Sequence, residues 1–150
     1  MKIFKLYLPL LLTIAICSIS QWLLGQESIT WKTLENVSYE MSYDSTADYV
    51  MMTPVYGESL NKLQGQEVEI KGYILPMDTE GTAFVLSAFP FSSCFFCGGG
   101  GKETVVELML DGEKSYTVDQ VKTFRGKLKL NDDPFGLNYI LEEAKEVDES

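Results

Sequence analysis

The stretch Glu67-Val68-Glu69-Ile70-Lys71-Gly72-Tyr73-Ile74-Leu75 decides the fold class of this chain. Val68, Ile70 and Ile74 recur at every second position, and charged residues or tyrosine stand between them. A period of two is typical of a strand that buries one face. Gly72 lies inside the pattern, and a glycine within a strand indicates a sharp bend of the kind found in small closed barrels.

Four more strands are expected after this one, with a short helix between the third and fourth strands of the set. The strands are expected at residues 82–88, 103–110, 125–131 and 137–143, and the helix at residues 117–124. This order is that of an OB-type barrel, a small five-stranded Greek-key barrel. We therefore expect a mostly-β protein with an OB-like barrel at residues 67–143; the alternative is a sandwich that includes the N-terminal strands.

The segment before the barrel has the pattern of a hairpin and a short helix. Residues 37–43 and 49–53 are expected to pair across a polar turn, with Pro54 ending the second strand. Residues 57–64 suit a short helix that stops at Gly65. We assign residues 26–66 to this segment, and residues 144–150 to a frayed acidic tail.

The first 25 residues have the composition of a secretory signal peptide. Lys2 and Lys5 precede an apolar run, which predicts export to the periplasm or beyond, with cleavage after Gly25. Two alternatives stay open. An uncleaved run would anchor the protein in the membrane, and Cys17 could instead carry a lipid anchor.

The charge balance and the missing histidine exclude several classes of function. The chain has 22 acidic and 12 basic residues, a formal charge of −10, and no histidine. A nucleic-acid surface needs a basic stripe, so no nucleic-acid partner is expected. Hydrolases that use a histidine base are also disfavoured. A conventional hydrolase is therefore not expected. We favour a non-enzymatic role, and a thiol–disulfide enzyme stays open as an alternative.

The stretch Cys94-Phe95-Phe96-Cys97-Gly98-Gly99-Gly100-Gly101 concentrates the chemistry of the chain. Two cysteines at this spacing followed by glycine form the half-site of zinc ribbons and rubredoxin-like knuckles. The leading hypothesis is a soft-metal site, with zinc or copper as the ion. The missing ligands would come from the same cysteine pair of a second chain in a homodimer, or from three other side chains, Glu103, Glu107 and Met77.

Two other functions fit the same loop. The cysteines could form a structural disulfide, because the exported compartment is oxidising, and Phe91, Phe95 and Phe96 would then serve as a contact surface for a partner. Alternatively, the pair could be a thiol–disulfide redox centre. Against the redox centre, glycines and a strand follow the second cysteine, so no helix N-terminus would stabilise a thiolate.

Thirteen residues spread over most of the chain carry a resemblance to a known family. They are Trp31, Pro54, Tyr56, Gly65, Gly72, Tyr73, Pro76, Phe84, Leu86, Ser87, Cys94, Cys97 and Gly98. This set resembles a family of small, exported, uncharacterised bacterial proteins with an OB-like barrel and a Cys-x-x-Cys-Gly loop. The resemblance implies no activity. It implies handling of a metal or small molecule beside membrane transport components.

Overall fold

The computed structural model describes residues 27–46, 48–112 and 114–147. The signal peptide expected at residues 1–25 lies outside the described residues, as does the lipid-anchor alternative at Cys17. Within the described ranges, no helix combines the length and the apolar character needed to cross a bilayer.

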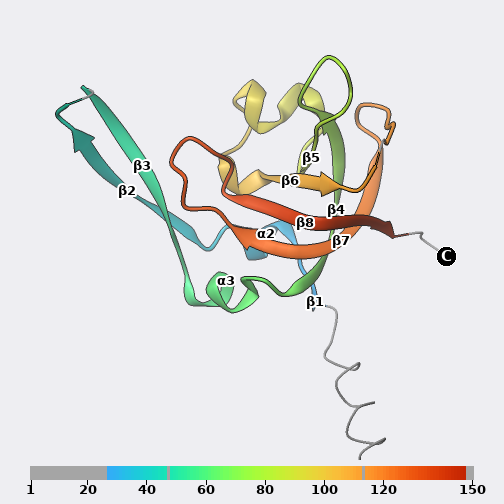
Figure 1. The fold of residues 1–150 in the computed structure, drawn as a ribbon, viewed down its shortest axis with the longest axis horizontal. Helices are drawn as coiled ribbons and strands as arrows, with labels where there is room; N and C mark the ends of the chain where they lie inside the picture. The colour runs from blue at the N-terminus through green and yellow to red at the C-terminus, as the bar shows by residue number, and fades with distance from the viewer. Residues whose placement is uncertain (1–26, 47, 113, 148–150) are drawn as a thin grey trace, which may run out of the picture.

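Five strands form a closed barrel with the strand order of an OB fold (Figure 1). The sheet order is β4-β5-β6-β8-β7, and a further pairing of β4 with β7 closes it. The pairing of β6 with β8 is parallel, and the other four barrel pairings are antiparallel. The strands are β4 (Glu67–Pro76), β5 (Phe84–Ser87), β6 (Val105–Leu110), β7 (Val121–Leu130) and β8 (Tyr139–Val147). The expectation of a mostly-β, OB-like barrel is confirmed.

Strand β4 follows its sequence pattern closely. Val68, Ile70 and Ile74 are buried in the barrel core, which the alternation predicted. A Cβ added at Gly72 would lie 2.6 Å from the carbonyl oxygen of Ser87 and 2.8 Å from the Trp31 ring. Because another strand and an indole ring approach this closely, only glycine fits the wall here.

The prediction of a helix at residues 117–124 is wrong. Strand β7 begins at Val121, and Val121 and Lys122 pair with Tyr73 and Gly72 of β4. Pairing with the long bent strand therefore overrides any local helical preference. Two helices from the N-terminal segment supply buried side chains to the barrel core instead. They are α2 (Trp31–Leu34), which buries Leu34, and α3 (Glu58–Leu63), which buries Leu60 and Leu63.

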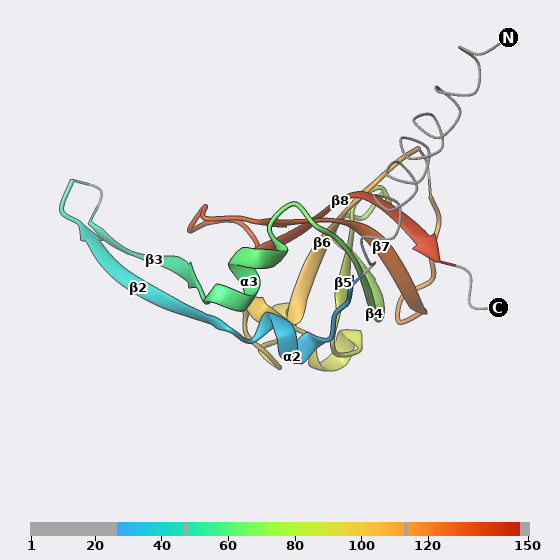
Figure 2. The same ribbon diagram turned by 90° about the horizontal axis from the view of Figure 1, so that it is seen from below.

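The N-terminal hairpin projects from the barrel as a two-stranded ribbon (Figures 1 and 2). It consists of β2 (Val37–Asp44) and β3 (Tyr49–Tyr56). The expectation that Pro54 ends the second strand is wrong, because Pro54 pairs with Tyr39 inside the ribbon. A strand with a free edge can accommodate a residue without an N–H. At its base the ribbon is fixed to the barrel: the Tyr56 hydroxyl donates to the Asn138 carbonyl at 2.9 Å.

Both ends of the described chain are tied into the barrel sheet. Strand β1 (Glu27–Ser28) pairs with β4 in parallel. Strand β8 continues to Val147, and Ala144 is buried against β6. The assignment of residues 144–147 to a frayed tail is therefore wrong, because pairing with β6 and β7 holds them. Residues 148–150 lie outside the described part of the chain.

Candidate functional site

The cysteine loop connects β5 to β6 and consists of three short 3-10 turns. These are η2 (Phe91–Ser93), η3 (Phe95–Cys97) and η4 (Lys102–Thr104). Gly98 has a φ of 81°, a left-handed conformation that favours glycine. A Cβ at Gly99 would lie 1.9 Å from the carbonyl oxygen of Ser93. Gly98 and Gly99, two of the four consecutive glycines, thus allow the backbone to turn back tightly.

Cys94 anchors this loop to the outside of the barrel wall. Its side chain is fully buried in a small apolar cluster with Leu75 and Val85, and Leu137 packs against that cluster. Its carbonyl oxygen accepts hydrogen bonds from the N–H groups of Cys97 and Gly99, each at 3.0 Å. The environment of Cys94 is therefore that of a small core residue.

Cys97 is exposed, and its thiol is protonated at neutral pH. The Cys97 Sγ donates to the Phe91 carbonyl oxygen at 3.1 Å. The pKa of Cys97 is raised, first by a hydrogen bond with the Cys94 thiol, then by desolvation and by the charge of Cys94. Both thiols are free in the structure. A catalytic redox cysteine needs a lowered pKa, so this geometry disfavours thiol–disulfide catalysis.

The structure does not bring the candidate further ligands to the two thiols. The charge of Glu103 acts on Tyr39 of the hairpin and on Tyr139 of β8. Glu107 and Met77 line a separate cavity. Among the described residues, no group of three or more histidine, cysteine, aspartate or glutamate side chains is arranged to hold a metal ion. A complete metal site would therefore need ligands from outside this chain.

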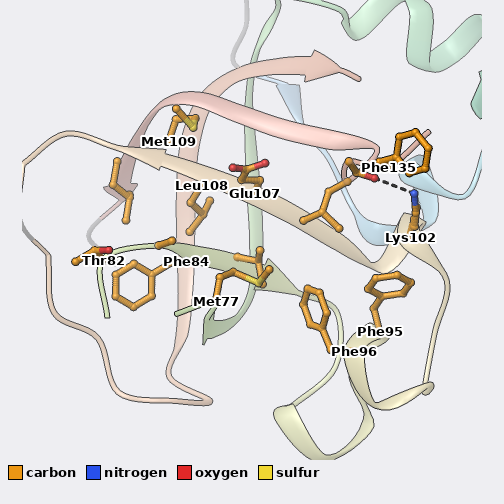
Figure 3. A pocket seen from close by; sticks show the side chains of 15 residues that line it. Met77, Thr82, Phe84, Phe95, Phe96, Lys102, Glu107, Leu108, Met109 and Phe135 are labelled. Carbon is orange, nitrogen blue, oxygen red and sulfur yellow. Dashed lines mark hydrogen bonds between the residues drawn. The ribbon is translucent and has the colours of Figure 1, made fainter. Parts of the chain in front are cut away.

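A cavity of about 560 Å³ lies over the outer face of β5 and β6 (Figure 3). Three connections surround it: the β4–β5 turn, the cysteine loop and the β7–β8 loop. Phe95 and Phe96 stand next to each other at its edge, with ring centroids 5.1 Å apart. The lining residues are Met77, Thr82, Ala83, Phe84, Val85, Phe95, Phe96, Lys102, Glu107, Leu108, Met109, Leu110, Phe135, Gly136 and Leu137.

Strand alternation decides which side chains of β6 reach this cavity. Val106 and Leu108 belong to the barrel core. Glu107 is only partly buried, and Met109 is exposed. Because successive side chains of a strand point to opposite faces, Glu107 and Met109 project outward on the cavity side. The floor of the cavity is thus the solvent face of a strand whose other face is core.

Lys102 ties two of the surrounding loops together. Its Nζ donates to the carbonyl oxygen of Pro134 at 2.9 Å. It also donates to the carbonyl oxygen of Gly136 at 2.8 Å (Figure 3). These bonds hold the β7–β8 loop, which carries Phe135, beside the cysteine loop. The cavity therefore has walls fixed by hydrogen bonds between segments more than 30 residues apart.

The sequence pattern identified part of this cavity and missed the rest. Phe95, Phe96, Met77 and Glu107 were singled out, and all four line it. Phe91 was also singled out, but it is not a lining residue, and its N–H donates to Asp119 Oδ1 at 2.7 Å instead. Among the lining residues that the sequence did not indicate are Lys102, Met109, Phe135 and Leu137. The available signal was the barrel order itself, which places the last loop beside the β5–β6 face.

Comparison with known proteins gives no relative: no family model, no curated protein and no solved structure matches the chain. The position of the cavity nevertheless agrees with a general property of the fold. OB barrels bind their ligands on the face of the second and third strands, between the first and last loops. Here those strands are β5 and β6. The fold therefore indicates where a ligand would bind, but only the side chains of the cavity can indicate which ligand it is.

Proposed function

We propose that this protein is an exported, non-enzymatic binding module that holds a small, largely apolar ligand in the cavity beside Phe95 and Phe96. The observation that carries the proposal is the cavity itself, about 560 Å³ and lined mainly by apolar side chains. Small-molecule sites are usually concave, mostly apolar and between about 300 and 1,000 Å³. Accessory work beside a membrane transport component is the role we propose for such a module.

Exposed aromatic and thioether side chains around the cavity support this function. Phe96, Met109 and Phe135 are exposed by 48%, 52% and 74%. Covering such surface stabilises a complex by roughly 25 cal/mol for each Å² of apolar area removed from water. Methionine also adapts to ligands of different shape, because its side chain is unbranched and flexible.

A neutral fluorescent probe tests this proposal. N-phenyl-1-naphthylamine brightens on entering an apolar site, so its titration gives an affinity directly. We expect saturable binding to the wild-type protein and a loss of roughly fivefold or more in Phe96→Ala, because truncating a contacting aromatic ring costs about 1 kcal/mol or more.

Phe89→Ala is the matched control for that titration. Phe89 is exposed by 40%, comparable with Phe96, and lies in the same loop, but it does not line the cavity. It should leave the probe affinity unchanged. Equal losses in both variants, or no saturable binding to the wild type, would contradict the proposal.

A second candidate function is binding of zinc or copper through Cys94 and Cys97. The observation that favours it is that both thiols are free and that Cys94 raises the pKa of Cys97, which indicates two soft ligands near each other. Since the described residues offer no third acidic, cysteine or histidine ligand there, the site would be completed by the same pair in a second copy, as a homodimer. Cys94 would have to leave its apolar cluster for this.

Native mass spectrometry of protein purified without chelator or reductant tests the metal site. A mass of two chains plus one ion, lost in Cys94→Ser, would support it. A metal-free monomer two hydrogens lighter than the reduced chain would mean a Cys94–Cys97 disulfide, and it would rule out the metal function.

A further inference from the structure

We infer that the cavity beside Phe95 and Phe96 selects an organic cation, such as a quaternary ammonium or a protonated amine on an apolar body. This inference rests on the proposed ligand-binding function and names its ligand class. It depends on Glu107, on the aromatic rings around it, and on the charge of the whole chain.

Glu107 is a carboxylate without a partner inside a mostly apolar cavity. It projects from the cavity floor between residues that face the core (Figure 3). Among the described residues, its carboxylate makes no hydrogen bond and no ion pair. Removing a charge from water costs less free energy when the charge is paired than when it is isolated. A partly buried carboxylate that lacks a partner therefore attracts a cation.

Four of the five other acidic residues on the barrel strands are ion-paired, and the fifth, Glu67, is exposed at the start of β4. A partly buried carboxylate without a partner is therefore particular to Glu107 among these strands. Ion pairs join four acidic residues of β4 and β8 to basic residues of β7. These pairs are Glu69 with Arg125, Glu142 with Lys129, Glu143 with Lys127 and Glu146 with Lys122. Glu107 lies on β6, which carries no lysine or arginine. A cation for Glu107 must therefore come from elsewhere.

Lys102 lines the same cavity but does not neutralise Glu107. Two donors of its ammonium group are taken by the carbonyl oxygens of Pro134 and Gly136. The ammonium charge is thus held at the loop edge by backbone dipoles. It would hinder a cation placed at that edge, so we expect the ligand charge to sit on the Glu107 side.

The rings favour an organic cation over a metal ion. Phe95, Phe96 and Phe135 line the cavity. Aromatic faces attract weakly hydrated cations, and alkylammonium ligands are commonly bound in this way. One carboxylate among apolar groups cannot replace the water shell of a calcium or magnesium ion, which needs six or more oxygen ligands. The formal charge of −10 adds a long-range attraction for cations.

An isosteric pair of ligands tests the inference on the wild-type protein. Phenyltrimethylammonium and tert-butylbenzene have the same shape and differ in charge, and 4-tert-butylbenzoate adds the opposite charge. Each is titrated against bound N-phenyl-1-naphthylamine. We expect phenyltrimethylammonium to displace the probe at a concentration roughly tenfold lower than tert-butylbenzene does, since a desolvated cation–π contact with a carboxylate partner is worth that factor.

Two conservative variants assign the preference to Glu107. Glu107→Gln should remove the preference for the cation and leave the affinity for the neutral probe unchanged. Glu40→Gln makes the same change of net charge on the hairpin, away from the cavity, and should keep the preference. Thermal melts of both variants show whether each is folded.

The outcomes separate this inference from the function on which it rests. If the neutral probe binds and tert-butylbenzene or the benzoate competes as well as the cation, the cation class is wrong and the binding function stands. If Glu40→Gln lowers the preference as much as Glu107→Gln, net charge and not Glu107 is responsible, and the inference is wrong. If the neutral probe does not bind at all, both proposals fail.

Discussion

At the scale of single residues, Gly99 shows how closely the cysteine loop is packed. An added Cβ there would meet the backbone of Ser93, with the carbonyl oxygen at 1.9 Å. At Gly100 an added Cβ would meet the side chain of Thr104 instead, at 2.7 Å. A backbone cannot move aside as a side chain can, so the two neighbouring glycines differ in how well they tolerate substitution.

We expect Gly99→Ala to lower the free energy of unfolding by about 2 kcal/mol or more, and Gly100→Ala by clearly less. Urea unfolding of the two variants measures the difference. Because Phe95 and Phe96 precede Gly99 in the same loop, Gly99→Ala should also weaken binding of N-phenyl-1-naphthylamine. Equal stability of the two variants would show that the loop is not packed as described.

The reactivity of Cys97 gives a second prediction at this scale. Its pKa is raised chiefly by the hydrogen bond with the Cys94 thiol. Removing that thiol removes the main cause, so Cys94→Ala should lower the pKa of Cys97. In the reduced protein, the rate of alkylation by iodoacetamide should therefore rise at a lower pH in Cys94→Ala than in the wild type. An unchanged pH profile would contradict the thiol contact.

At the scale of elements, the N-terminal helices are part of the barrel core and not a separate unit. Leu34 of α2 and Leu60 of α3 are fully buried in the same cluster as Val68 and Phe124 of the barrel. The Tyr139 hydroxyl of β8 donates to the Leu34 carbonyl oxygen at 2.6 Å, which binds α2 to the last strand. These contacts make barrel stability depend on a segment that precedes it in sequence.

Leu60→Ala should therefore destabilise the whole protein by about 2–5 kcal/mol in a single cooperative transition. Lys62→Ala, on the same short helix, is the control: the Lys62 side chain is 72% exposed, and its ion pair with Glu58 contributes little. Chemical unfolding followed by circular dichroism measures both. Two separate transitions in the wild type would contradict a shared core.

The elements also show where prediction from sequence succeeds. Strand β4 and helix α3 were predictable, because each carries its own pattern: alternation in β4, and a glycine stop after α3. The start of β7 was not predictable, because its pairing partner, β4, lies about 50 residues earlier in the chain. The cavity was only partly predictable for the same reason, since Phe135 and Lys102 meet through loops that local periodicity does not describe.

At the scale of the whole molecule, the buried Tyr139 and the partly buried Tyr56 make stability depend on pH in the alkaline range. Burial raises the pKa of Tyr56 to about 12, and it raises the pKa of Tyr139 further. In the unfolded chain a tyrosine ionises near pH ~10. Above that pH the unfolded state loses protons that the folded state keeps, so the unfolded state is favoured. Below pH ~10, both the folded and the unfolded state hold these protons, so the stabilisation that the two tyrosines provide does not change with pH.

We expect the contribution of these two tyrosines to the free energy of unfolding to be steady from neutral pH to pH ~10 and then to fall as the pH rises toward about 12. The free energy of unfolding of Tyr139→Phe should fall less steeply over this range. At neutral pH it should cost about 1 kcal/mol, because it removes the bond to the Leu34 carbonyl. Urea unfolding at a series of pH values measures both effects. An equally steep decline in Tyr139→Phe would contradict the assignment.

Methionine methyl NMR tests most directly whether the cavity over β5 and β6 binds a ligand. The described residues contain five methionines: Met77 and Met109 line the cavity, and Met41, Met51 and Met52 lie on the hairpin. On titration with benzyl alcohol, a soluble neutral aromatic, the Met77 and Met109 methyl signals should shift and saturate while the hairpin signals stay in place. Shifts confined to the hairpin, or shared equally by all five methionines, would contradict a binding site at the cavity.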